Sequence, residues 1–187
     1  MKLVRLAAVA VALVALAGCE VYRSAPMGEE VVSITASDWE GFWLTEDGPV
    51  AIEVVNVDAG ELMISGIDLR QQDDGVEGPP NVWSNLVYLR RSGGWLFGSV
   101  ENEDEPGLWE WARIKKDGDQ LIIWAPRGSA FRELVSEGVL PGIVERGEYA
   151  STTTLGELSP AHYELITSGA RGVLLDWEDP FVLRRIH

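Results

Sequence analysis

Residues 108–124, LWEWARIKKDGDQLIIW, contain the strongest indication of the fold in this chain. Two segments rich in aromatic and β-branched residues, 108–115 and 120–124, flank the sequence Lys116-Asp117-Gly118-Asp119. An Asp-Gly pair between two such segments is typical of a tight turn that joins antiparallel strands, because glycine accepts the positive φ that the turn requires. The stretch therefore predicts a β-hairpin.

The first strand of this hairpin carries apolar side chains on both faces. Side chains alternate along a strand, so Trp109, Trp111 and Arg113 share one face while Ala112 and Ile114 lie on the other. Two interpretations are open. The indole rings fill the middle of a small barrel, or they form a platform on which a sugar ring or a lipid stacks, with Arg113 pairing an anionic head group. The candidate ligand-binding residues are Trp43, Trp95, Trp109, Trp111 and Arg113.

Short segments with a period of two continue on both sides of this hairpin, separated by turn residues, which is the pattern of an all-β chain. Loops rich in Asp, Pro and Gly are expected at 71–81 and 101–107. Further strands or strand-like apolar segments are expected at 39–43, 50–57, 62–69, 82–91, 95–101, 139–144, 172–175 and 181–186.

Two short helices are expected in the C-terminal third. Ser129 is placed to cap a helix over 130–137. Ser159 is placed to cap a second helix, with Pro160 at its first position and Gly169 after its end. The predicted fold class is therefore mainly β: an antiparallel meander that closes into a small barrel, with these two helices late in the chain. Closure is favoured because it removes exposed strand edges.

The N-terminus differs from the rest of the chain. Residues 1–5 supply two positive charges, and residues 6–17 form an unbroken apolar run. This run is too short for a membrane-spanning helix, which needs about 20 apolar residues, and has the layout of a secretory signal. It ends in Leu16-Ala17-Gly18-Cys19, which resembles the lipobox of bacterial lipoproteins.

The lipoprotein resemblance implies that Cys19 is acylated and becomes the first residue of the mature chain. Two or three acyl chains would hold the protein on a bilayer. Glu20 follows the cysteine where similar proteins kept in the inner membrane carry Asp, so the resemblance favours the outer membrane, facing the periplasm. The expected organisation is a signal peptide at 1–18, a lipidated tether at 19–37 and a single β-rich domain at 38–187.

A second resemblance concerns the barrel. Gly41-Phe42-Trp43 is similar to the Gly-x-Trp motif of lipocalins, and a late helix followed by a strand ending in Arg184-Arg185 is similar to their layout. The resemblance implies an eight-stranded cup for a small apolar ligand, in which a late arginine covers the tryptophan. No second lipocalin motif is present and the first helix is an extra element, so another antiparallel barrel or a sandwich remains open.

Composition and motifs argue against several functions. The chain has 15 basic and 30 acidic residues and a formal net charge of −15, which argues against binding nucleic acid or anionic lipid by charge. His162 and His187 are the only histidines, and no Gly-x-Ser-x-Gly elbow occurs, so no enzyme is expected. No metal site and no cofactor are expected either, because the histidine and cysteine patterns of metal sites are absent.

Two binding functions follow. The first is a carrier or sensor of a small apolar or amphipathic ligand held in a barrel lined with tryptophan. The second is an envelope interaction or assembly factor whose acidic, tryptophan-bearing surface docks a protein or glycan. A deep apolar cavity at Trp109 and Trp111 favours the first, and a filled core with an exposed aromatic patch favours the second.

Overall fold

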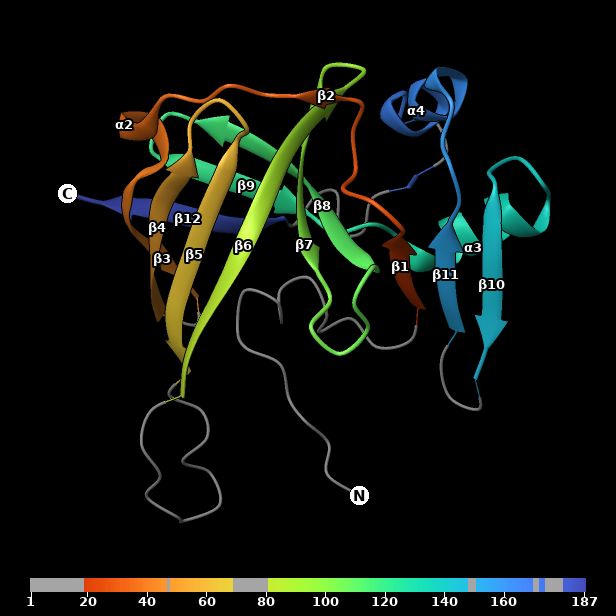
Figure 1. Cartoon of the computed structure of the whole chain (residues 1–187), viewed down its shortest axis with the longest axis horizontal. Helices are drawn as coiled ribbons and strands as arrows, with labels where there is room; N and C mark the ends of the chain where they lie inside the picture. The colour runs from red at the N-terminus through yellow and green to blue at the C-terminus, as the bar shows by residue number, and fades with distance from the viewer. Residues whose placement is uncertain (1–18, 47, 69–80, 148–150, 170–171, 174–179) are drawn as a thin grey trace, which may run out of the picture.

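The computed structural model describes residues 19–46, 48–68, 81–147, 151–169, 172–173 and 180–187 (Figure 1). These residues form twelve strands of one sheet and three short helices. The helices are α2 (Ala36–Trp39), α3 (Gly128–Ser136) and α4 (Pro160–Thr167). The strands are β1 (Cys19–Arg23), β2 (Glu30–Val31), β3 (Gly41–Thr45), β4 (Gly48–Asn56), β5 (Glu61–Asp68), β6 (Asn81–Ser92), β7 (Trp95–Glu101), β8 (Trp109–Asp117), β9 (Gln120–Trp124), β10 (Gly142–Arg146), β11 (Ser151–Leu155) and β12 (Phe181–Ile186).

Eight of the strands close into an antiparallel barrel. Strands β3 to β9 follow one another as a meander, each paired with the next. The last strand, β12, then lies between β9 and β3 and pairs antiparallel with both. This closed barrel confirms the predicted fold class, and the pairing of 113–117 with 120–124 confirms the predicted hairpin.

The sheet extends beyond the barrel at β8. The C-terminal half of β8 pairs with β9, whereas its first residue, Trp109, pairs with Arg23 of β1. Strand β1 is parallel to β11, which is antiparallel to β10. These three strands stand beside the barrel with α3 and α4 (Figure 1). The wall formed by β7 and β8 therefore has the barrel interior on one side and a second layer on the other.

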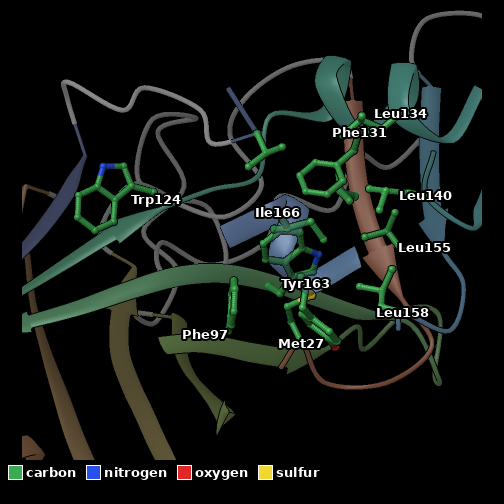
Figure 2. Packing of buried hydrophobic residues seen from close by; sticks show 13 residues of the cluster. Met27, Phe97, Trp124, Phe131, Leu134, Leu140, Leu155, Leu158, Tyr163 and Ile166 are labelled. Carbon is green, nitrogen blue, oxygen red and sulfur yellow. The ribbon is translucent and has the colours of Figure 1, made fainter. Parts of the chain in front are cut away.

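Each side of this wall has its own apolar core. The inner core occupies the barrel, and its buried members are Val32, Trp39, Trp43, Val50, Ile52, Leu62, Ile64, Trp83, Val87, Leu89, Leu121 and Leu183. The outer core packs the helices and β1 against the wall (Figure 2), and its members are Val21, Met27, Phe97, Trp111, Trp124, Phe131, Leu134, Leu140, Leu155, Leu158, Tyr163, Ile166 and Val173. Alternation along β7 and β8 assigns neighbouring residues to opposite cores.

The segment 19–37 is not a tether, which corrects the expected organisation. Its first five residues form β1, and Met27 and Val32 are buried. Met27 N–H donates to Ser99 Oγ at 2.9 Å, and Arg23 Nη1 donates to Tyr163 Oη at 2.7 Å. The segment has few large apolar residues, so its composition resembles a linker. Its partners come from distant parts of the chain, and only the tertiary fold brings them together.

The helix predictions are partly confirmed. Ser159 caps α4, because its side chain accepts from the backbone N–H of His162 and the His162 ring accepts from the N–H of Ser159. The predicted cap at Ser129 is wrong: α3 begins at Gly128, two residues before the predicted start at 130, and its N-cap residue is Arg127. A helix in residues 36–39 and the strand β11 were not expected. Most of the predicted loop at 71–81 and half of the segment 172–175 lie outside the described residues.

Candidate functional site

A pocket of about 470 Å³ lies at one end of the barrel, between the N-terminal segment and the rim formed by β6, β7 and β8. Residues 32–39, here called the strap, follow β2, include α2 and cross this end of the barrel (Figure 1). The pocket volume is in the range of small-molecule sites. The described residues that line it are Val32, Ser33, Ile34, Thr35, Asp38, Trp39, Arg91, Gly94, Trp95, Leu96, Arg113, Ile114, Lys115 and Lys116.

Backbone hydrogen bonds hold the strap on the rim. Ile34 N–H donates to the carbonyl of Val57 at 3.0 Å, and, just before the strap, Glu29 N–H donates to the carbonyl of Arg91 at 3.1 Å. The turn before β5 lies very close to the strap. A Cβ added at Gly60 would lie only 2.6 Å from the carbonyl oxygen of Val32, which is too close for a side chain. The φ of Gly60 is also +64°, so glycine is the residue that fits this position. The strap is therefore an integral cover of the barrel end.

The apolar part of the pocket comes from both the strap and the barrel. Ile34 and Trp39 lie on the strap side, and Leu96 and Ile114 lie on β7 and β8. Trp39 is buried, and its carbonyl accepts a hydrogen bond of 2.9 Å from Trp43 Nε1. This bond joins the end of the strap to the inner core, so the pocket has a rigid apolar floor.

The charged part of the pocket has the opposite sign to the whole protein. Four of its lining side chains are cationic, Arg91, Arg113, Lys115 and Lys116, and Asp38 is the single acid among its described lining residues. The chain as a whole has twice as many acidic as basic residues. A concentration of positive charge at a concave site attracts anions through its local field. The pocket is therefore suited to a negatively charged group.

Arg113 is held by two indole rings. Its guanidinium carbon lies 4.2 Å from the ring centroid of Trp95 and 4.8 Å from that of Trp124. Such cation–π contacts position a guanidinium without neutralising it. Burial lowers the pKa of Arg113 from its ordinary value, yet an arginine remains charged near neutral pH. Arg113 thus supplies a fixed positive charge beside the pocket.

Two of the five candidate ligand-binding residues, Trp95 and Arg113, line the pocket. Trp111 instead lies in the outer core, 1 % exposed, with its ring edge-on to Phe97 and Phe131 at centroid distances of 5.8 and 5.4 Å. Trp109 is half-buried and edge-on to Tyr88 at 5.1 Å. Trp109 and Trp111 therefore do lie on one face of β8, as predicted. That face points away from the barrel interior, so Trp111 is buried between the barrel and the helices.

Trp43, the fifth candidate, belongs to the inner core and is covered by Arg185. The guanidinium carbon of Arg185 lies 4.8 Å from the centroid of the Trp43 ring. Arg185 Nη2 also donates to the carbonyl of Glu40 at 2.9 Å. A late arginine over this tryptophan is the arrangement that the resemblance to lipocalins implied. It ties the last strand to the first strand of the barrel.

Sequence reasoning missed Trp39, Arg91, Lys115 and Lys116 as site residues. The run Arg113-Ile114-Lys115-Lys116 is visible as a basic stretch in an acidic chain, and this was the available signal. Trp39 was missed as a site residue because the segment before it was interpreted as a tether. That interpretation left the end of the barrel without a cover and so without a pocket.

A separate polar cluster lies at the other end of β8. Tyr22 Oη donates to Glu20 at 2.8 Å, and Asn102 Nδ2 donates to Glu110 Oε1 at 3.3 Å and to Tyr22 Oη at 3.4 Å. Burial, with a smaller contribution from the charge of Glu20, raises the pKa of Glu110 to about 7. Burial and the hydrogen bond to Glu20 raise the pKa of Tyr22 well above its ordinary value. No cation of the pocket takes part in these contacts.

The other titratable side chains of the described residues do not gather into a metal site. No group of three or more His, Cys, Asp or Glu side chains among them is placed to hold a metal ion. His162 is occupied by the cap of α4, and His187 lies 3.2 Å from Asp119 on the surface. No helix in the described ranges is long and apolar enough to cross a membrane. Comparison with protein-family models, with curated proteins and with solved structures finds no match.

Proposed function

We propose that this protein binds a small amphipathic molecule, without catalysis, in the pocket beneath the strap. The observation that carries the proposal is the pocket itself, which combines an apolar floor with two indole rings and a charged rim. Aromatic side chains bury large apolar surfaces and stack on flat groups, and a few polar groups at the rim orient the ligand. An amphipathic molecule matches both halves of this lining.

The proposed ligand lies at the mouth of the barrel and not deep inside it. Large side chains of the inner core, among them Trp43, Leu62 and Leu183, occupy the barrel interior and are almost fully buried. A cup of the lipocalin kind is therefore proposed here in a shallow form. Trp39 and Trp95 are the indole rings proposed to contact the ligand, in place of the expected Trp109 and Trp111.

We further propose that acyl chains on Cys19 anchor the protein to the outer membrane of a bacterial envelope. The support is the lipobox resemblance of Leu16 to Cys19. Strand β1 begins at Cys19 and its arrow points toward the upper edge of the molecule in Figure 1, along which the strap lies. An anchor at Cys19 thus leaves the pocket away from the point of attachment and open to ligand from the periplasm.

The test is native mass spectrometry of residues 19–187 with Cys19→Ser, purified from the periplasm without detergent. This form keeps all the described strands and helices. We expect a bound small molecule that is lost in Trp95→Ala, which lines the pocket, and retained in Trp109→Ala, which does not. If the protein carries no ligand and binds no amphiphile added in titration, the proposal is wrong.

A second candidate function, docking of an envelope protein or glycan, is favoured by apolar side chains on the outer barrel wall. Phe42 and Val82 are 64 % and 70 % exposed, and Leu44 and Ile67 are also exposed. None of the described tryptophans is exposed, so this surface differs from the tryptophan-bearing one expected from the sequence. Crosslinking in cells from position 42 tests it, and a partner captured there but not from the control position 146 supports it.

A further inference from the structure

We infer that the ligand of the pocket is an anionic amphiphile whose carboxylate or phosphate is held by Arg91 and Lys116 at the rim. The inference rests on the proposed function and names its ligand class. The apolar body of the ligand would lie against Trp39 and Leu96, on the floor of the pocket. Positive charge is concentrated at this rim although the protein as a whole is strongly acidic.

Among the described residues, no acid forms an ion pair with Arg91 or Lys116, although Glu30 lies opposite Arg91 in the pairing of β2 with β6. Acids nevertheless outnumber bases two to one in the chain. Lys116 Nζ donates to the carbonyl of Gly118 at 3.0 Å, which is a neutral acceptor. Lys115 differs, because it pairs with Asp117 at 2.9 Å. Within the part of the chain that the structure describes, the pocket cations without an acid partner are therefore Arg91 and Lys116.

The neighbouring Arg113 strengthens the same field without competing for the ligand. Its guanidinium lies between the rings of Trp95 and Trp124 and stays in place. Its charge adds to those of Arg91 and Lys116 in a site partly shielded from water, where charges interact more strongly than on an open surface. An anion entering the pocket thus meets Arg91 and Lys116 at the rim, with Asp38 as the opposing acid among the described lining residues.

The overall charge makes this arrangement selective. A formal charge of −15 repels anions at long range, so an anion binds only where local cations overcome that repulsion. A neutral amphiphile would gain only the apolar contacts with the floor. Salt screens charge interactions between partly exposed groups, so binding of the anion should weaken as ionic strength rises while binding of a neutral analogue should not.

The experiment compares three amphiphiles with the same twelve-carbon chain: dodecanoate, dodecyl phosphate and neutral 1-monododecanoylglycerol. Each is titrated below its micelle concentration into residues 19–187 carrying Cys19→Ser, by isothermal calorimetry. The pocket variant is Arg91→Gln with Lys116→Gln. The matched control is Arg146→Gln with Arg184→Gln, which removes the same charge at exposed positions outside the pocket. The single variant Lys116→Gln is included in case the double variant does not fold.

We expect at least one anion to bind more tightly than the neutral amphiphile, and its affinity to fall about tenfold in the pocket variant and less than about twofold in the control. The tighter of the two anions identifies the head group as carboxylate, as in a free fatty acid, or phosphate, as in a lysophospholipid. If the neutral amphiphile binds as tightly as the anions, or if the pocket variant binds them unchanged, the inference fails and the proposed function stands. If none of the three binds, the proposed function fails with it.

Discussion

Two buried tryptophans provide a matched test of the two cores, because the same substitution should have different effects at each. Trp43 is 0 % exposed and its indole N–H donates to the carbonyl of Trp39. Trp111 is 1 % exposed, and its N–H has no hydrogen-bond partner among the described residues. Substitution by phenylalanine keeps an aromatic ring and removes the N–H in both. The difference between Trp43→Phe and Trp111→Phe therefore reports mainly on hydrogen bonding.

The expected free energies of unfolding follow from this contrast. Each substitution removes roughly 40 Å³ of side chain, which at about 24 cal/mol per Å³ costs about 1 kcal/mol. Trp43→Phe also leaves a buried carbonyl of Trp39 without its donor, at about 1–3 kcal/mol, and weakens the stacking of Arg185. Trp111→Phe instead removes an unsatisfied buried donor and recovers about 1–3 kcal/mol. We expect Trp43→Phe to destabilise by about 3 kcal/mol, and Trp111→Phe to lie between wild-type stability and about 2 kcal/mol above it.

The assay is equilibrium unfolding in urea of residues 19–187 with Cys19→Ser, followed by far-ultraviolet circular dichroism because tryptophan emission changes with the substitutions. Equal slopes against urea in all three proteins show that the same surface is exposed on unfolding. If Trp111→Phe lost as much stability as Trp43→Phe, the reasoning would be refuted that the Trp43 N–H is hydrogen-bonded and the Trp111 N–H is not.

Three further predictions concern other parts of the fold. The raised pKa of Glu110 means that the folded protein binds more protons than the unfolded chain between about pH 4.5 and 7, so its contribution to stability falls as pH rises through this range. A full shift of this size corresponds to about 3 kcal/mol, which solvent screening at a half-buried site reduces to about 1–2 kcal/mol. The urea midpoint of the wild-type protein should therefore fall relative to that of Glu110→Gln between pH 4.5 and 7.5. A difference between the two midpoints that stays constant with pH would contradict this. Gly66→Ala should lower the free energy of unfolding by about 1–3 kcal/mol in the urea assay, because a Cβ there would overlap the buried ring of Trp83. Ser65→Ala, at the neighbouring position, is the control and should have a smaller effect. Ser159→Ala should cost about 1 kcal/mol in the same assay through loss of the α4 cap, and a variant as stable as wild type would show that the cap contributes little.

Some of the fold follows from local patterns. The hairpin at 108–124 is predictable because Asp117-Gly118 marks the turn, whose two loop residues are Gly118 and Asp119, and because the flanking residues alternate on two strands. These interactions are close in sequence. The cap at Ser159 is predictable for the same reason, since donor and acceptor are three residues apart. The boundary of α3 was missed because no side chain caps it, so the sequence around Ser129 contains no local signal for its start.

The candidate site follows from the sequence only in part. Trp95 and Arg113 were recognised because they stand out by residue type, but the same reasoning selected Trp109 and Trp111, which do not line the pocket. Alternation shows which residues share a face of a strand, and it does not show whether that face meets ligand, solvent or another layer. The outer core that buries Trp111 is built from helices and strands far from β8 in sequence, such as α3 and β11.

By itself, the sequence determined the β class of this protein, most of its barrel strands, the cap of α4 and its acidic character, because each depends on residue types or on interactions between near neighbours. Only the tertiary structure decided that residues 19–37 belong to the domain, that β12 closes the barrel, and that the strap meets Arg91 and Lys116 over a pocket. These features depend on contacts between segments far apart in the chain. Their stability comes from burial that no single segment provides, so a local pattern does not reveal them.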